Sequence, residues 1–210
     1  MKTKLTVLFF ILFSSNLFAQ SDKQAEKMIT DFIKSVKESA IQMDFEMNVY
    51  DQENELNQTQ KGTFTMKNDK FSLLMHDVHI FFDGKTQWAY VASSNEVSIT
   101  EPLEDELTET NPIFILQEYQ NKSTITFSSD NKSPENYIIK MVPLIDSDFS
   151  KIVAEVNKST KNLVSLNLSG KNGFSVSIVF SNFRQGLNIS DNVFTFDKNK
   201  YEDVFENDLR

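Results

Sequence analysis

Cysteine is absent from this 210-residue sequence, and histidine occurs only twice. The chain therefore has no disulfide framework, no thiol nucleophile and no cysteine zinc ligand, so a hydrophobic core must hold the fold together. His76 and His79 lie three residues apart in an expected strand, where side chains alternate between faces. They cannot bind one metal ion from a regular strand, and we expect both to be surface or half-buried structural residues.

A long apolar run is also missing. LTVLFFILF (residues 5–13) is too short for a membrane span, which needs about 20 apolar residues. Two lysines precede it, and the small residue Ala19 precedes polar sequence, which is the layout of a signal peptide. We therefore expect residues 1–19 to be cleaved on export and residues 20–210 to form one domain. No cysteine follows the apolar run, so we expect no lipid anchor.

Positive charge is in deficit. The sequence has 21 lysines and arginines against 30 acidic residues, a net charge of −9, and two of the lysines lie in the expected signal peptide. This balance argues against binding nucleic acid or an anionic membrane surface. The acidic run EPLEDELTE (residues 101–109) lacks the turn glycine of a calcium loop. It is either a solvated loop or a contact patch for a basic partner.

Catalytic motifs are missing as well. The sequence contains no nucleophile elbow and no paired zinc-ligand motif, and Asp83-Gly84-Lys85 lacks the glycine spacing of a phosphate loop. We therefore expect no catalytic residue, no metal site and no cofactor. What the sequence does contain is phenylalanine, with 19 residues.

Two periodicities mark the start of the expected domain. Residues 21–39 have apolar side chains at spacings of three and four, with Ser21 and Gln24 in the positions of a capping box, which predicts an amphipathic helix. IQMDFEMNV (residues 41–49) alternates between apolar and polar residues, which predicts a strand with one buried face.

Short strands dominate the rest of the sequence. Asp83-Gly84 between two apolar runs predicts a hairpin with a type I′ turn. A short helix should begin at Pro112 with Asn111 as its N-cap. The further strands are expected at about 60–67, 70–75, 78–82, 86–91, 95–100, 123–128, 136–142, 150–156, 162–168, 174–183 and 193–196. The pattern predicts a mainly β (α+β) fold with one antiparallel sheet of about eleven strands, which must curl or close.

Several motifs follow one another in a fixed order along the chain. They are residues 62–67 (GTFTMK), 70–71 (KF), 83–90 (DGKTQWAY), 96–100 (EVSIT), 110–116 (TNPIFIL) and 193–196 (VFTF). The ordered set resembles the LolA family of periplasmic carriers, which ferry lipoproteins to the outer membrane. The resemblance implies an unclosed antiparallel β-barrel, with an N-terminal helix and a short helical lid over an apolar cavity.

The same resemblance implies a mode of action. Such a carrier is a periplasmic monomer that accepts acylated lipoproteins from an inner-membrane ABC transporter and releases them to an outer-membrane acceptor, without nucleotide or covalent chemistry. Two features depart from the family. Lys67 stands where the family has a gating arginine before a proline, and the acidic tail after Phe196 matches no family motif.

The resemblance also implies site residues. Phe71 and Leu73 share a strand face and fall where the family places cavity residues. Lys67 is expected to contact the C-terminal end of a lid helix, where the helix dipole favours a cation. The other candidates for the cavity lining are Phe64, Met43, Phe45, Trp88 and Phe114.

Two other functions stay open. A protein of the same fold could carry another lipid or sense misplaced lipoproteins. Alternatively, the curled sheet could be filled by its own side chains and serve as an interaction domain of the envelope. An apolar cavity would favour a binding function, and a filled core would favour the interaction domain.

Overall fold

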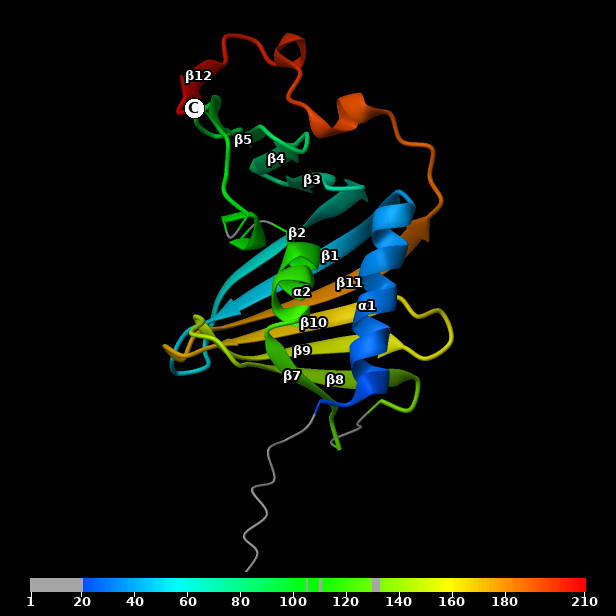
Figure 1. The fold of residues 1–210 in the computed structure, drawn as a ribbon. Helices are drawn as coiled ribbons and strands as arrows, with labels where there is room; N and C mark the ends of the chain where they lie inside the picture. The colour runs from blue at the N-terminus through cyan, green and yellow to red at the C-terminus, as the bar shows by residue number, and fades with distance from the viewer. Residues whose placement is uncertain (1–20, 105, 110, 130–132) are drawn as a thin grey trace, which may run out of the picture.

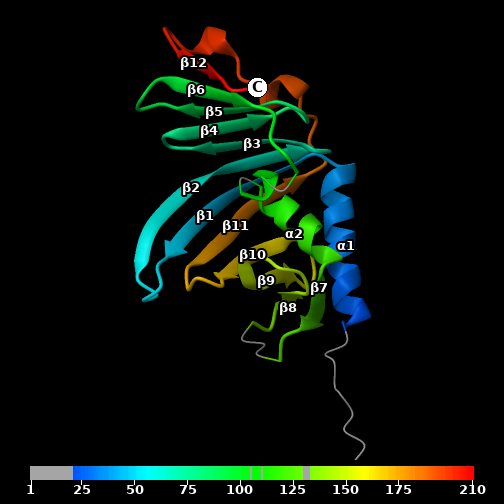
Figure 2. The same cartoon turned by 60° about the vertical axis from the view of Figure 1, so that its left-hand side comes forward.

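One curved sheet with two α-helices on its inner face makes up the fold (Figures 1 and 2). The computed structural model describes residues 21–104, 106–109, 111–129 and 133–210, so the expected signal peptide lies outside the described residues. The helices are α1 (Lys23–Glu38), α2 (Pro112–Gln120) and three short 3-10 helices, η1 (Glu106–Glu109), η2 (Asp191–Phe194) and η3 (Lys198–Lys200). None of the described helices is long and apolar enough to cross a membrane.

The sheet contains 12 strands in the described part of the chain. They are β1 (Ile41–Tyr50), β2 (Leu56–Lys67), β3 (Lys70–Met75), β4 (Val78–Phe82), β5 (Gln87–Val91), β6 (Glu96–Thr100), β7 (Ser123–Phe127), β8 (Asn136–Pro143), β9 (Phe149–Asn157), β10 (Leu163–Gly170), β11 (Ser175–Gln185) and β12 (Phe205–Asp208). Their order is β12-β6-β5-β4-β3-β2-β1-β11-β10-β9-β8-β7, so the sheet remains open between β12 and β7. This confirms the expected unclosed barrel with an N-terminal helix and a second, short helix.

Helix α1 lies across the inner face of the sheet (Figure 1), and its apolar side chains are buried in the core. Its N-cap is Asp22, whose Oδ1 accepts hydrogen bonds from the backbone N–H groups of Gln24 and Ala25. The expected capping box at Ser21 is wrong, because Ser21 Oγ instead accepts from Ile125 N of β7 at 3.0 Å. Asp22 N donates to Ile125 O at 2.7 Å, so the start of α1 is attached to an edge strand.

Helix α2 begins as the sequence predicts. Asn111 is its N-cap and Pro112 occupies the first turn, where the missing N–H of proline costs nothing. The next four residues, 113–116, are all buried, although a surface helix would bury only one stripe. They are buried on several sides because α2 lies between the sheet, α1 and η1.

The hairpin between β4 and β5 forms at the expected place with a different turn. Phe82 pairs with Gln87, which leaves a four-residue loop in place of a two-residue one. Only Gly84 in this loop has a positive φ, at +100°, whereas a type I′ turn requires two such residues. Asp83 Oδ1 accepts from Lys85 N and Thr86 N at 2.9 and 2.8 Å, so the aspartate side chain takes over the stabilisation of the turn.

The chain after β11, residues 187–210, is called here the C-terminal segment. The expected strand at 193–196 is wrong, because residues 191–194 form η2 against β3 and β4. Both of these strands already have two neighbours, so no sheet edge is free for another strand there. The free edge lies at β6, where β12 pairs in parallel, the one parallel pair among the described strands.

The C-terminal segment covers an aromatic cluster on the outer face of the sheet. Tyr90 and Val97 are buried there beneath Phe196, Tyr201 and Val204, and the rings of Tyr90 and Tyr201 lie 4.3 Å apart. These residues form the outer aromatic cluster. The sheet is therefore covered on its inner face by helices and, around β4 to β6, on its outer face by the C-terminal segment (Figure 2).

Candidate functional site

A cavity of about 300 Å³ lies between the inner face of the sheet and the start of α2. Seven neighbouring strands, β4, β3, β2, β1, β11, β10 and β9, contribute its floor, and every side chain that they supply is apolar. The floor residues are Ile80, Leu73, Met75, Phe64, Phe45, Met47, Val176, Ile178, Phe180, Leu168 and Phe149. The cover consists of Thr108, Asn111, Pro112 and Ile115.

The curvature of the sheet explains how distant parts of the chain meet in this cavity. Strands β1 and β2 pair along their length, and β1 also pairs with β11, which brings residues 45 and 180 side by side. Alternate residues of each strand share a face, so every second side chain points inward. At the cavity these inward side chains are apolar. An apolar pocket with few polar groups is the usual form of a small-molecule binding site.

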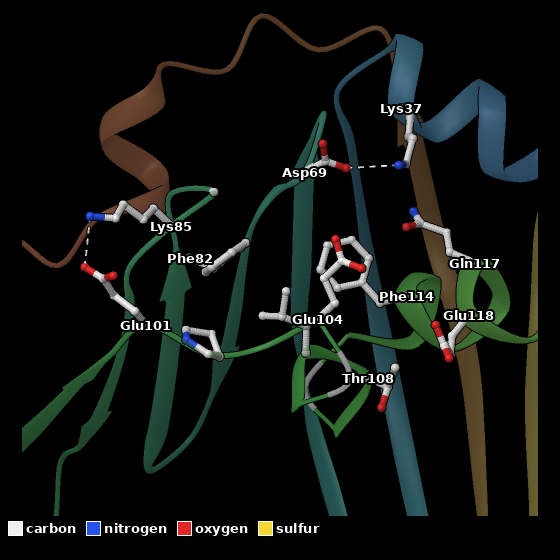
Figure 3. A pocket seen from close by; sticks show the side chains of 13 residues that line it. Lys37, Asp69, Phe82, Lys85, Glu101, Glu104, Thr108, Phe114, Gln117 and Glu118 are labelled. Atoms are coloured by element: carbon white, nitrogen blue, oxygen red, sulfur yellow. Dashed lines mark ion pairs between the residues drawn. The ribbon is translucent and has the colours of Figure 1, made fainter. Parts of the chain in front are cut away.

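A second depression is a groove of about 630 Å³ (Figure 3). It lies beside the cavity, and Thr108 lines both. Phe82, Leu107 and Phe114 supply its apolar floor. Its rim is mostly acidic, with Asp69, Glu101, Glu104 and Glu118 against Lys37 and Lys85. Helix α2 separates the two spaces, because neighbouring faces of this helix border the cavity and the groove.

Two ion pairs lie at this groove (Figure 3). Lys37 Nζ of α1 lies 3.1 Å from Asp69 Oδ1 in the turn between β2 and β3. Lys85 Nζ lies 3.1 Å from Glu101 Oε1. Lys122 donates a hydrogen bond to the rim residue Glu118, and this contact raises the pKa of Lys122.

The site contains no arrangement for metal binding in the described residues, where no group of three or more histidine, aspartate or glutamate side chains converges. Binding within the cavity must therefore depend on apolar contact and on the two polar side chains of its cover, Thr108 and Asn111.

Comparison with known families agrees with this geometry. The family model for outer membrane lipoprotein carrier protein LolA matches residues 16–160, more than half of the chain. The chain belongs to the LolA family. A comparison with curated proteins finds no match.

Several solved structures are similar to this chain at low sequence identity. An uncharacterized conserved protein from Thermus thermophilus has a TM-score of 0.60 and 9% identity, over 89% of this chain and 99% of that chain. A LolA superfamily protein from Nitrosomonas europaea has a TM-score of 0.46 and 11% identity, over 82% of this chain and 98% of that chain. LprF from Mycobacterium bovis has a TM-score of 0.42 and 13% identity, over 81% of this chain and 97% of that chain. At 9% identity, the likeness to the Thermus thermophilus protein concerns the fold alone.

From the LolA resemblance, seven residues were expected to line the cavity. The structure places only some of them in its lining. Phe45, Phe64 and Leu73 line the cavity. Phe71 is fully buried beside it, with its ring centroid 6.1 Å from that of Phe64 and 5.9 Å from that of Phe114.

Three of the seven lie elsewhere. Phe114 lines the groove, and Met43 is fully buried in the core under the helices. Trp88 lies on the opposite face of the sheet and packs against the outer aromatic cluster. The expectation that Trp88 lines the cavity is therefore wrong. On β5 it is Ala89, the next residue, that faces the inner core, because side chains alternate along a strand.

Lys67 also has partners other than those expected from the LolA gating arginine. Its Nζ donates to Ile189 O at 2.9 Å and to Asp191 Oδ1 at 2.8 Å. Lys70 Nζ donates to the other oxygen of Asp191 at 2.7 Å. These hydrogen bonds lower the pKa of Asp191 to about 2. Lys67 thus contacts the C-terminal segment, and the ion pair between a helix and the β2–β3 turn is that of Lys37 with Asp69.

The alternation of apolar residues along the strands also indicates several cavity residues that are not part of the LolA motifs. Met47 shares the inner face of β1 with Phe45, and Met75 shares that of β3 with Leu73. The alternation of Val176, Ile178 and Phe180 along β11 likewise predicts one common face. Nothing in the sequence says that β11 pairs with β1, and that pairing brings these residues to the cavity.

Proposed function

We propose that the protein is a periplasmic lipoprotein carrier. In this proposal residues 1–19 are cleaved on export, and the domain of residues 20–210 shields acyl chains in the cavity while lipoproteins move from the inner to the outer membrane. The observation that carries the proposal is the cavity of about 300 Å³, whose sheet-borne lining is wholly apolar. The cavity favours a binding function over an interaction domain with a filled core.

The energetics of acyl chains make such a cavity useful. Burying an acyl chain contributes about 0.8 kcal/mol per CH₂, so a bare chain in water is strongly disfavoured and must be shielded in transit. The side chains of the cavity wall carry no charge, so a chain inside it meets only apolar surface and the two polar groups of the cover. Binding and release of this kind need neither nucleotide nor covalent chemistry on the carrier.

The size of the cavity implies movement. At about 300 Å³ it lies at the lower end of the range for ligand pockets, so a lipoprotein with several acyl chains needs additional space. The neighbouring groove provides that space if α2 and η1, which separate it from the cavity, are displaced. The Lys37–Asp69 ion pair lies at the groove and is solvent-exposed, so breaking it costs only about 0.2–1 kcal/mol.

The partners follow from the carrier role. We propose that the protein acts as a monomer, accepts acylated lipoproteins from an inner-membrane ABC transporter, and delivers them to an outer-membrane acceptor. The acidic rim of the groove, which includes Glu101 and Glu104, is suited to a basic surface on such a partner. The same cavity would also serve a carrier of another lipid or a sensor of misplaced lipoproteins.

Two adjacent leucines of β3 provide a matched test of acyl binding. Leu73 lines the cavity, whereas Leu74 points to the other face and is 38% exposed. Leu73→Trp should fill the cavity and weaken binding of a fluorescent acyl probe about tenfold, equivalent to excluding about two methylene groups. Leu74→Trp should leave the affinity unchanged. Equal affinities in both variants would show that acyl chains do not bind here.

Transport itself requires a test in the host cell. Depletion of the protein should cause lipoproteins to accumulate in the inner membrane, as measured by membrane fractionation. Wild-type protein and Leu74→Trp should restore outer-membrane delivery, and Leu73→Trp should not. Normal lipoprotein distribution after depletion would leave a lipid-binding protein with a different role.

A further inference from the structure

One polar side chain in the cavity wall has an unused donor. Asn111 is only 1% exposed, and it lies where the cover of the cavity meets the first turn of α2. Its Oδ1 accepts from Ile113 N at 2.8 Å and from Phe114 N at 3.4 Å. Among the residues that the structure describes, its Nδ2 has no hydrogen-bond partner.

The orientation of this amide follows from the chemistry of the helix start. The N–H groups of Ile113 and Phe114 can only donate, so the side-chain atom facing them must be the acceptor oxygen. The NH₂ group therefore has to occupy the other position. A buried donor without an acceptor is costly, and a ligand that supplies an acceptor recovers that free energy.

The surroundings of Asn111 limit what the ligand can be. The side chains of the cavity lining include no lysine, arginine or histidine, so a free carboxylate buried there would lack a cationic partner. A neutral carbonyl oxygen attached to an apolar chain fits both the single donor and the apolar floor. An acyl ester has that composition.

We infer that Asn111 Nδ2 donates a hydrogen bond to the ester carbonyl oxygen of an acyl chain bound in the cavity. The inference rests on the proposed carrier function and adds chemical selectivity to it. The methylene groups of the acyl chain contact the apolar strands. The hydrogen bond from Asn111 fixes how deeply the carbonyl group enters the cavity. The protein then distinguishes acyl esters from hydrocarbon or ether-linked chains of the same length.

The test compares two short probes that differ only in the carbonyl group, dioctanoylglycerol and the corresponding dioctyl ether. Wild-type protein should bind the ester about two- to tenfold more tightly, the range expected for one net hydrogen bond. Asn111→Ser and Asn111→Asp both keep an oxygen that can cap α2 and remove the NH₂ group. Both variants should bind the two probes with similar affinities, and their ether affinity should match that of wild type.

The chain offers a matched control at the other α-helix. Asp22 caps α1 through the same pair of contacts, to the N–H groups two and three residues further on, and it is not among the residues that line the cavity. Asp22→Ser should therefore keep the full preference for the ester. The carbonyl stretching band of a ¹³C-labelled ester should shift to lower frequency on binding to wild type and to Asp22→Ser, and should not shift with Asn111→Ser.

The outcomes separate the inference from the function on which it rests. Equal binding of ester and ether by wild type would overturn the role of Asn111 and leave the carrier proposal standing. Equal weakening of both probes by the Asn111 variants would also overturn it, since Asn111 would then act only by holding α2 in place. Failure of wild type to bind either probe would contradict the proposed function itself.

Discussion

At the scale of single residues, Gly62 of β2 lies where the structure leaves no room for a side chain. A Cβ atom at this position would lie 2.3 Å from Leu74 O and 2.9 Å from the ring of Phe45. Gly62 pairs directly with Phe45 on β1, and Phe45 lines the cavity. The absence of a side chain at position 62 therefore leaves the space in which the Phe45 ring lies.

Gly62→Ala should consequently destabilise the fold. The added methyl group forces β2 away from β3 or displaces the Phe45 ring, and overpacking of this kind costs about 1–3 kcal/mol. Thermal unfolding by circular dichroism measures the effect. The double variant Gly62→Ala/Phe45→Leu should regain little stability, because the contact with the backbone oxygen of Leu74 remains. Full recovery in the double variant would assign the strain to the ring alone.

At the scale of elements, the sequence correctly predicted features that depend on interactions between neighbouring residues. Asn111 followed by Pro112 predicted the start of α2, because capping and a fixed φ act within one turn. The alternation of VFTF predicted a strand at 193–196 and failed, because strand formation also needs a free sheet edge. The partners of Lys67 could not be predicted from the sequence either, since Asp191 lies 124 residues further along the chain. Alternation predicted which residues of a strand share a face, but it predicted neither which face lines the cavity, as Trp88 shows, nor which strands meet.

The contact of Lys67 and Lys70 with Asp191 should hold the C-terminal segment to the sheet. Lys67→Ala should raise hydrogen exchange in residues 187–210 by up to about fivefold, the range of an exposed ion pair. Lys85→Ala is the matched control, because it removes an exposed lysine whose partner is Glu101. Unchanged exchange in Lys67→Ala would remove this contact from the attachment of the segment.

The same contact should depend on pH in a defined direction. The pKa of Asp191 is lowered from 3.8 to about 2, so its contribution to stability is present above about pH 4 and is lost as the pH falls towards 2. Exchange in the C-terminal segment of wild type, divided by the exchange rate of the unstructured chain at the same pH, should therefore rise in that window. In Asp191→Asn this rise should be absent, with faster exchange already at neutral pH.

At the scale of the whole molecule, both ends of α1 are attached to the half of the sheet that contains β7 and β11. The start of α1 is attached to Ile125 of β7. Near its end, Ser35 O accepts from Nε2 of Gln185, the last residue of β11, and Ser39 Oγ accepts from Gly186 N, both at 3.0 Å. The strands β3 to β6 lie on the other side of the groove, and the Lys37–Asp69 ion pair joins them to α1 (Figure 3). Widening of the groove therefore requires this ion pair to break.

Removal of that ion pair should favour the open form and hence the binding of bulky acyl ligands. A ligand shifts an equilibrium only by its differential affinity for the two states, so a probe with two long chains should respond and a single short chain should not. Lys37→Ala and Asp69→Ala should each raise the affinity for the two-chain probe by up to about fivefold, since an exposed ion pair contributes about 0.2–1 kcal/mol. The double variant should show no further increase.

Lys34 provides the control on the same helix. Its Nζ lies 3.7 Å from Glu38 Oε1, within α1, so Lys34→Ala removes a similar surface charge without releasing the sheet. The affinity of Lys34→Ala should equal that of wild type. High salt should raise the wild-type affinity towards that of Lys37→Ala, because it screens the exposed pair. If Lys34→Ala and Lys37→Ala raise the affinity equally, the cause is net charge, and the Lys37–Asp69 contact does not restrain opening.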